Sequence, residues 1–278
     1  MPLLFGTAGV PLSAADKSSE GGVKRIRELN LDAMELEFVQ GVRMGIEKAR
    51  KVGAVALKEK VALSCHAPYY INLNSREPEK IAASRERILQ AARIAQILGV
   101  RGVVFHPAFN HGDAPEVVFA RVAESVNLVR ETLEAEGNAV TLRPETTGKE
   151  SQFGSLEETI RLAQEIPGVL PCIDFSHLHA RSNGGYNTYD EFCLVLEKTA
   201  EALGEPWVKN VHFHISGIEY GAKGEKKHLV LKESDLRYEE LLKACQTFGV
   251  EGLAICESPN LEEDALLLQQ AYYNSLLT

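Results

Sequence analysis

The segment PCIDFSHLH, from Pro171 to His179, begins apolar and ends polar. Its first part continues an apolar run that starts at Val169 and has no helical period, which predicts a buried strand. Its second part holds Asp174, His177 and His179. A strand that is apolar along its length and polar at its carboxyl end is typical of a barrel strand that delivers side chains to an active site.

Seven further apolar runs of this kind alternate with amphipathic stretches, which predicts eight strand-and-helix units. The expected strands are 3–8, 33–39, 62–67, 102–107, 140–145, 170–175, 208–215 and 253–257. The expected helices are 21–31, 41–55, 77–98, 114–136, 155–165, 188–203, 236–248 and 261–277. This order predicts an α/β fold, a (β/α)8 TIM barrel forming a single domain over residues 1–278. The alternative is a doubly wound open sheet, but the chain has no glycine-rich nucleotide loop, so we expect no nucleotide cofactor.

Composition limits the functional class. The formal net charge of −9 argues against a protein that coats DNA, although it leaves room for a compact site where cations meet phosphate. The five cysteines are odd in number and unclustered, which is typical of core residues in a reducing cytoplasm. There is no apolar run long enough to span a membrane and no signal-peptide pattern at the start of the sequence. We therefore expect a cytoplasmic protein that does not bind membranes, and we expect a monomer.

Histidines and carboxylates gather where the predicted strands end, and six of the eight histidines lie there or just beyond. In chain order the polar residues are Glu35, Glu37, His66, His106, Glu145, Asp174, His177, His212, His214, His228 and Glu257. Imidazole nitrogens and carboxylate oxygens without thiolates suit Zn²⁺, Mn²⁺ or Fe²⁺ in a catalytic site. These residues offer more ligands than one cation needs, and a single carboxylate can bridge two cations. Of Glu35 and Glu37, we expect one to face the barrel interior or its mouth and the other the helices.

These residues resemble the endonuclease IV family, the metal-dependent apurinic/apyrimidinic endonucleases with a TIM-barrel fold. The most specific part runs from His66 in HAPYYINLN to His106 in FHP. Asp174-x-x-His177 and the H-x-S-G at His214 are also similar to family motifs. The resemblance implies an enzyme of DNA base excision repair, a hydrolase that cleaves double-stranded DNA 5′ to abasic sites. It also implies two or three divalent cations, which we expect to be zinc, with manganese as the alternative.

The resemblance further implies a role for individual residues. His66, His106 and Glu145 would hold the first metal; Glu145, Asp174, His214 and Glu257 the second; His177 and His228 part of the third. Glu145 and Glu257 are the candidate catalytic residues, and Arg43 and Tyr69 the candidate DNA-binding residues. The third position departs from the family, which has Asp-x-His where this chain has Lys226-Lys227-His228. Lysine is not a cation ligand at neutral pH, so Glu225 or His179 would have to substitute.

Two other functions stay open at this point. Sugar isomerases and epimerases of the xylose-isomerase-like barrels use one metal, which Glu145, Asp174, His214 and Glu257 could hold. The nitrogen ligands His66, His106 and His177 favour the nuclease, whereas Lys226 and the negative net charge favour the isomerase. The other alternative is a metal-binding scaffold without activity. His214 is preferred over His212 as a ligand, because we expect His212 to lie on the same side of the strand but one layer deeper.

Overall fold

The computed structural model describes residues 3–100 and 102–274, and these form a TIM barrel. Its eight strands are β1 (Leu3–Ala8), β2 (Ala33–Glu37), β3 (Ala62–His66), β4 (Gly102–Phe105), β6 (Thr141–Pro144), β8 (Ile173–Asp174), β9 (Val211–Ile215) and β12 (Gly252–Cys256). They pair in parallel in the order β6-β4-β3-β2-β1-β12-β9-β8. Bridges from Leu142 to Val169 and from Glu145 to Cys172 join the two ends and close the barrel.

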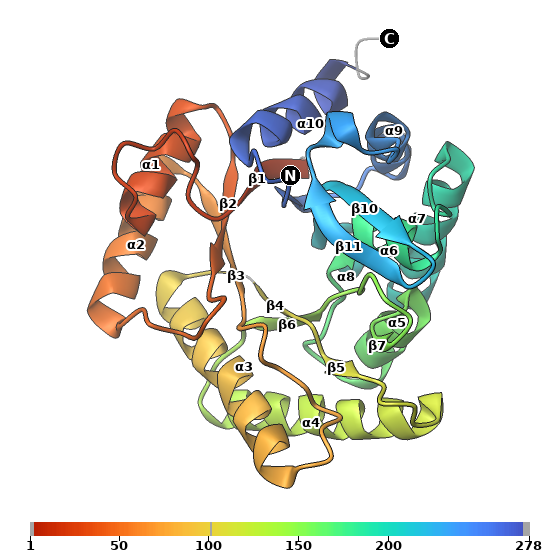
Figure 1. The fold of residues 1–278 in the computed structure, drawn as a ribbon. Helices are drawn as coiled ribbons and strands as arrows, with labels where there is room; N and C mark the ends of the chain where they lie inside the picture. The colour runs from red at the N-terminus through yellow and green to blue at the C-terminus, as the bar shows by residue number, and fades with distance from the viewer. Residues whose placement is uncertain (1–2, 101, 275–278) are drawn as a thin grey trace.

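A long helix follows each barrel strand and packs on the outside of the sheet (Figure 1). These helices are α1 (Ser19–Glu28), α2 (Ile46–Glu59), α3 (Pro78–Leu98), α4 (Pro115–Ala135), α5 (Leu156–Glu165), α7 (Tyr189–Leu203), α9 (Tyr238–Phe248) and α10 (Glu262–Asn274). Local signals explain several ends: Ser155 and Glu158 form a capping box at α5, and Gly99 and Gly249 end α3 and α9 in the left-handed conformation. No helix in the described part of the chain is long and apolar enough to cross a membrane.

Some predicted boundaries are wrong. The strand predicted to end at Phe175 ends at Asp174, because Asp174 caps a short helix, α6 (Phe175–Arg181), and accepts a hydrogen bond from the His177 amide. Val208 belongs to the short helix α8 (Glu205–Val208) and not to a strand. The second helix begins at Ile46 instead of residue 41. The predicted end of the last helix lies outside the described residues.

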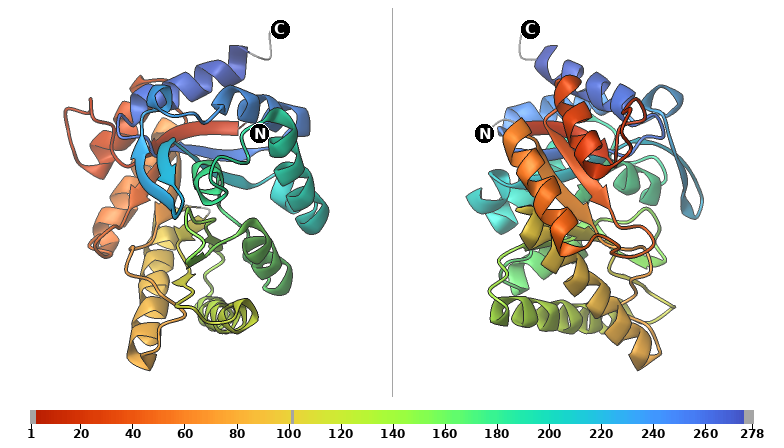
Figure 2. Two further views of the ribbon diagram at one scale, coloured as in Figure 1. Left: turned by 45° about the vertical axis from the view of Figure 1, so that its right-hand side comes forward. Right: turned by 90° about the vertical axis from the view of Figure 1, so that its left-hand side faces the viewer.

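Three further elements stand between the predicted units. A hairpin of β10 (Gly217–Gly221) and β11 (Gly224–Leu229) follows β9, and a short 3₁₀ helix, η1 (Leu231–Glu233), follows the hairpin. A two-stranded ribbon joins β5 (Ala108–Phe109) to β7 (Gln152–Phe153). Figure 2 shows the hairpin at the end of the barrel opposite the start of β1. The hairpin therefore lies over the carboxyl ends of the strands, the end at which TIM barrels carry their sites.

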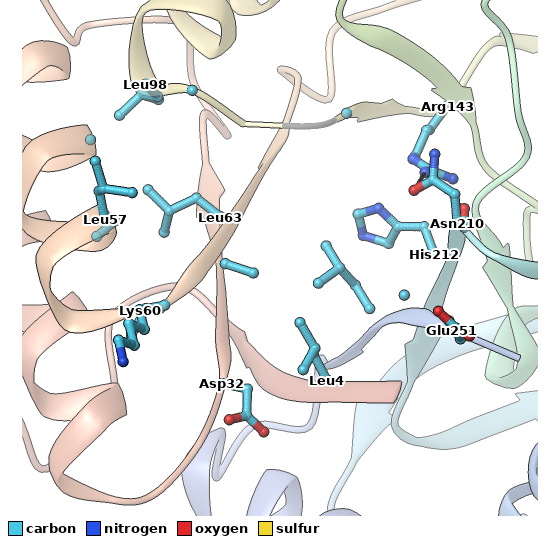
Figure 3. Close-up of a pocket in the computed structure, with 18 of the residues that line it drawn as sticks. Leu4, Asp32, Leu57, Lys60, Leu63, Leu98, Arg143, Asn210, His212 and Glu251 are labelled. Atoms are coloured by element: carbon cyan, nitrogen blue, oxygen red, sulfur yellow. Dashed lines mark hydrogen bonds between the residues drawn. The ribbon is translucent and has the colours of Figure 1, made fainter. Parts of the chain in front are cut away.

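The opposite end of the barrel holds a cavity of about 650 Å³. Figure 3 shows leucines such as Leu57, Leu63 and Leu98 on one side of it, with Arg143, Asn210 and His212 on the other. Arg143 is buried and donates hydrogen bonds to the backbone oxygen and side-chain oxygen of Asn210. The barrel interior is thus not wholly apolar, because polar side chains extend from this cavity towards the carboxyl ends of the strands.

Candidate metal centre

Glu145, the first residue after β6, lies at the centre of the polar residues at the carboxyl end of the barrel. Its Oε2 atom is 3.1 Å from Nε2 of His66 and 3.1 Å from Nε2 of His106. Its Oε1 atom is 3.2 Å from Nδ1 of His177 and 3.3 Å from Nδ1 of His214. Each oxygen of one carboxylate therefore faces a separate set of imidazoles.

The first group consists of His66, His106 and Glu145, whose ligand atoms converge at the ends of three strands that are neighbours in the sheet. Nδ1 of His66 lies 2.7 Å from the carbonyl oxygen of Ala67. Because a carbonyl only accepts, Nδ1 carries a proton, and Nε2 is the nitrogen that donates to Glu145 when the ring is charged and that could bind a cation when it is neutral. Burial alone would lower the pKa of His66, but hydrogen bonding to Glu145 and the charge of Glu37 raise it to about 10.

The second group consists of Glu145, Asp174, His214 and Glu257, whose ligand atoms lie within 4.8 Å of one another. Asp174 is buried, and its Oδ2 atom accepts no hydrogen bond from any described residue. Burial raises the pKa of this carboxyl group to about 7. A buried carboxylate oxygen without a donor, beside two further carboxylates and an imidazole, fits a divalent cation.

The third group consists of His177 on α6 with Glu225 and His228 on β11. Nε2 of His177 lies 3.7 Å from Oε2 of Glu225 and 3.5 Å from Nε2 of His228. Lys226 is exposed and pairs with Glu219 across the hairpin at 3.2 Å. Glu225, and not Lys226, thus brings a carboxylate to this group.

His179 does not reach the third group. Its Nδ1 atom lies 2.8 Å from the backbone oxygen of Gly185, and its Nε2 atom lies 3.1 Å from Oδ1 of Asp235. The other substitute considered from the sequence, Glu225, is fixed in place because its amide donates to the backbone oxygen of Gly148 at 2.9 Å.

Glu35 and Glu37 correct one expectation, because both point towards the inside of the barrel. Residues two apart on a strand share a face, and the carboxylates of Glu35, Glu37 and Glu257 lie within 4.8 Å of one another. Burial raises the pKa of Glu37 to about 8. For Glu35 burial acts in the same direction, but the interactions with His214 and His212 outweigh it and hold the pKa well below its usual range.

His212 lies one layer deeper than His214, as predicted. It lines the cavity at the amino end of the barrel (Figure 3), and its Nε2 atom is 3.0 Å from Oε2 of Glu35. Burial lowers the pKa of His212 to about 4, so its imidazole is neutral at neutral pH.

A cavity of about 290 Å³ opens above the first and third groups. Tyr69 forms part of its wall, half-exposed, with its ring edge on His66 at a centroid distance of 5.4 Å. Burial raises the pKa of the Tyr69 phenol. Arg43 is exposed in the loop after β2 and lines a neighbouring hollow instead.

The sequence interpretation missed four residues of this cavity wall: Ala108, Phe109, Lys149 and Gln152. The only available signal was their position in the loops that follow the fourth and fifth predicted strands. All eight predicted ligand residues, in contrast, fall within the three groups.

The model of the xylose isomerase-like TIM barrel family matches residues 23–273. An uncharacterised protein of Methanocaldococcus jannaschii is 47% identical over 270 residues, 97% of each chain. A probable endonuclease 4 of a Geobacillus species is 29% identical over 211 residues, which span 73% of this chain and 62% of that protein.

Among solved structures, endonuclease IV of Thermus thermophilus superposes with a TM-score of 0.71 at 20% identity, over 97% of this chain and 98% of the other. A D-tagatose 3-epimerase-like protein superposes with a TM-score of 0.72 at 18% identity, over 97% of both chains. At such identities these superpositions show a shared fold, and they do so equally for a nuclease and for an epimerase-like protein.

Proposed function

The chain belongs to the xylose isomerase-like TIM barrel family, and from this premise we propose that it is a metal-dependent endonuclease that cleaves DNA 5′ to abasic sites. One observation carries the proposal: Glu145 presents one oxygen to His66 and His106 at 3.1 Å and the other to a second set of ligands. This is the arrangement that a carboxylate bridging two cations requires. The similarity to a probable endonuclease 4 supports the same reading.

The three groups divide the expected ligands among three cations. His66, His106 and Glu145 would hold the first, and Glu145, Asp174, His214 and Glu257 the second. His177 and His228 would hold the third, with Glu225 in place of the aspartate that Lys226 replaces. Bound divalent cations, which we propose to be zinc, would activate a water and stabilise the leaving oxygen of the phosphodiester.

Side chains around the cavity would position the substrate and move the proton. Glu257 is largely buried, and its Oε1 atom is 3.3 Å from Nδ1 of His214, so it is placed to orient water and accept its proton. Lys149 lines the same cavity and brings an ammonium group to a site for a phosphodiester. Tyr69 and Arg43 stand at or beside the mouth, where they would contact the bases that flank the abasic nucleotide.

A sugar epimerase is the second candidate, supported by a specific feature of the site. Glu145, Asp174, His214 and Glu257 alone could hold one cation, and the enclosed volume of about 290 Å³ suits a monosaccharide. The first group argues against an epimerase. A single-metal enzyme would not need the imidazoles of His66 and His106 beside the carboxylate of Glu145.

The deciding experiment is incision of a duplex that carries one tetrahydrofuran abasic analogue, with the metal content of each preparation measured. We expect a single nick on the 5′ side of the analogue and none in an undamaged duplex. The same preparations are tested for epimerisation of ketohexoses at C3. Absence of a nick with metal bound would exclude the nuclease, and epimerisation by the same preparation would establish the second candidate.

A further inference from the structure

Glu35 of β2 lies inside the barrel, directly beneath the second group of ligands, and is completely buried. Its Oε1 atom is 2.9 Å from Nε2 of His214, and its Oε2 atom is 3.0 Å from Nε2 of His212. Oε2 also accepts a hydrogen bond of 2.6 Å from the hydroxyl of Ser64. Oε2 is thus held by a hydrogen bond, whereas Oε1 lies close to Nε2 of His214 without an aligned hydrogen bond among the described residues.

His214 presents its two ring nitrogens to different partners. Nε2 faces Glu35, whereas Nδ1 lies 3.3 Å from Oε1 of Glu145 and 3.3 Å from Oε1 of Glu257. A neutral imidazole has one N–H and one lone pair, and an ionised carboxylate can only accept a proton. A cation bound at Nδ1 needs the lone pair of that nitrogen, so the one N–H of the neutral ring must then lie on Nε2, the nitrogen that faces Glu35.

We propose that Glu35 is a positioning residue of the metal centre, which fixes the tautomer and the orientation of His214. Outer-shell carboxylates that accept from a ligating histidine hold its ring and increase its basicity. The hydroxyl of Ser64 donates a hydrogen bond to the carboxylate of Glu35, and the ring of His212 lies against the same oxygen from deeper in the barrel. This inference rests on the metal-binding part of the proposed function and is independent of whether the substrate is DNA or a sugar.

The cost of placing Glu35 here argues against an ordinary structural role. The interior of a TIM barrel is usually filled by branched apolar side chains, and a buried carboxylate is unfavourable unless other groups compensate it. Here three polar side chains surround this one carboxylate. The need to hold the imidazole of His214 in one orientation would explain why a carboxylate is buried at this position.

The test uses the full chain loaded with Co²⁺, whose visible absorption reports ligand geometry, and compares Glu35→Gln with Glu37→Gln. Both variants replace one buried carboxyl group of the same strand by an amide, but only the first changes the carboxylate beside His214. For Glu35→Gln we expect Co²⁺ affinity, measured by competition with a chelator, to fall about 10–100-fold. We also expect an altered spectrum and an unchanged number of bound ions. Glu37→Gln should keep the parent spectrum.

Each alternative gives a different result. Equal weakening in both variants would mean that loss of any buried carboxyl group near the site explains the effect, and it would overturn the proposal. Loss of one bound ion in Glu35→Gln alone would make Glu35 a ligand instead, whereas unchanged affinity and spectrum would leave it without a role. If Glu35→Gln does not fold, Ser64→Ala replaces it, with a smaller weakening and a spectral change expected; an unchanged spectrum would count against the proposal. A negative incision assay beside a positive Co²⁺ result would reject the nuclease and keep Glu35 in this role.

Discussion

The strand-borne and hairpin-borne parts of the candidate centre use the same kinds of side chain but differ in how firmly they are held. His66 and Glu145 stand at the carboxyl ends of barrel strands, with 3% and 1% of their side chains exposed, although His106 after β4 is 27% exposed. Glu225 and His228 stand on β11, in a two-stranded hairpin, with 22% and 25% exposed. Since buried elements open less readily than exposed ones, the strand-borne part is preorganised and the hairpin-borne part is the adjustable one.

A small number of contacts attach the hairpin near its tip. The Tyr220 hydroxyl donates to Oδ2 of Asp235 at 2.7 Å, and Oδ1 of the same residue lies 3.1 Å from Nε2 of His179. The close approach of Gly224 to Gly148 also matters, because a Cβ atom on Gly224 would come within 2.2 Å of the Gly148 oxygen. Gly224 has φ of +85°, which favours glycine on its own account.

The largest effect is expected from Glu145→Gln, which tests whether the strand-borne part carries the reaction. The amide keeps the shape of the side chain but has one oxygen where a bridge needs two. We expect activity to fall by about three orders of magnitude, the scale of losing a group that stabilises transition-state charge, and the first two cations to bind more weakly. Glu150→Gln, an exposed neighbour on the same loop, serves as the control. Retained activity in Glu145→Gln would refute the bridging role.

The second prediction concerns the hairpin-borne part alone. Glu225→Gln and His228→Ala should each remove about one cation and lower activity about 10–100-fold, the range found when groups around a metal are lost. The cations at the strand ends should remain. Lys226→Gln is the matched control, since Lys226 pairs with Glu219 outside the group. Elemental analysis of the purified variants measures the result, and a loss of all metal in His228→Ala would show that the two parts bind cooperatively.

This division also explains what the sequence could predict. His66, His106, Glu145 and Glu257 could be predicted as neighbours because an apolar run that turns polar marks a strand end, and parallel strands bring those ends together. From the sequence, Glu225 was one of two possible substitutes for Lys226. The hairpin that carries Glu225 could not be predicted, because residues 217–229 mix glycine, lysine and apolar side chains without a clear alternating pattern. The partnership of Glu35 with His214 joins strands far apart in sequence, so only the closed barrel reveals it.

A smaller effect is expected from Asp235→Asn, which loosens the hairpin without touching a ligand. Asp235 is more than half exposed, so its contacts with Tyr220 and His179 contribute about 1 kcal/mol or less. We expect amide hydrogen exchange to rise several-fold in β10 and β11 while the barrel strands stay protected. Glu219→Gln removes another exposed pair on the same hairpin and should leave the tip attached. Equal exchange in both variants would mean that Asp235 does not anchor the hairpin.

The last prediction concerns a reversal in how pH changes thermal stability. In the metal-free protein, burial raises the pKa of Asp174 to about 7 and that of Glu37 to about 8, far above their values in an unfolded chain. The folded state then holds protons that the unfolded state has lost, so the stabilisation from these two groups is present at low pH and is lost as pH rises through 7 and 8. His66, with a pKa raised to about 10, acts in the same direction.

With cations bound, the sign should invert, because protons compete with the metal for the same carboxylates and imidazoles. Between pH 6 and 8.5 we expect Tm to fall by about 5 °C without metal and to rise by a similar amount with it, since a domain of this size shifts by about 2–4 °C per kcal/mol. Calorimetry with and without chelator measures both slopes. The residues responsible are strand-borne, so His228→Ala should keep the reversal. If His228→Ala loses the reversal, the coupling between proton binding and stability depends on the hairpin-borne cation and not on the residues at the strand ends.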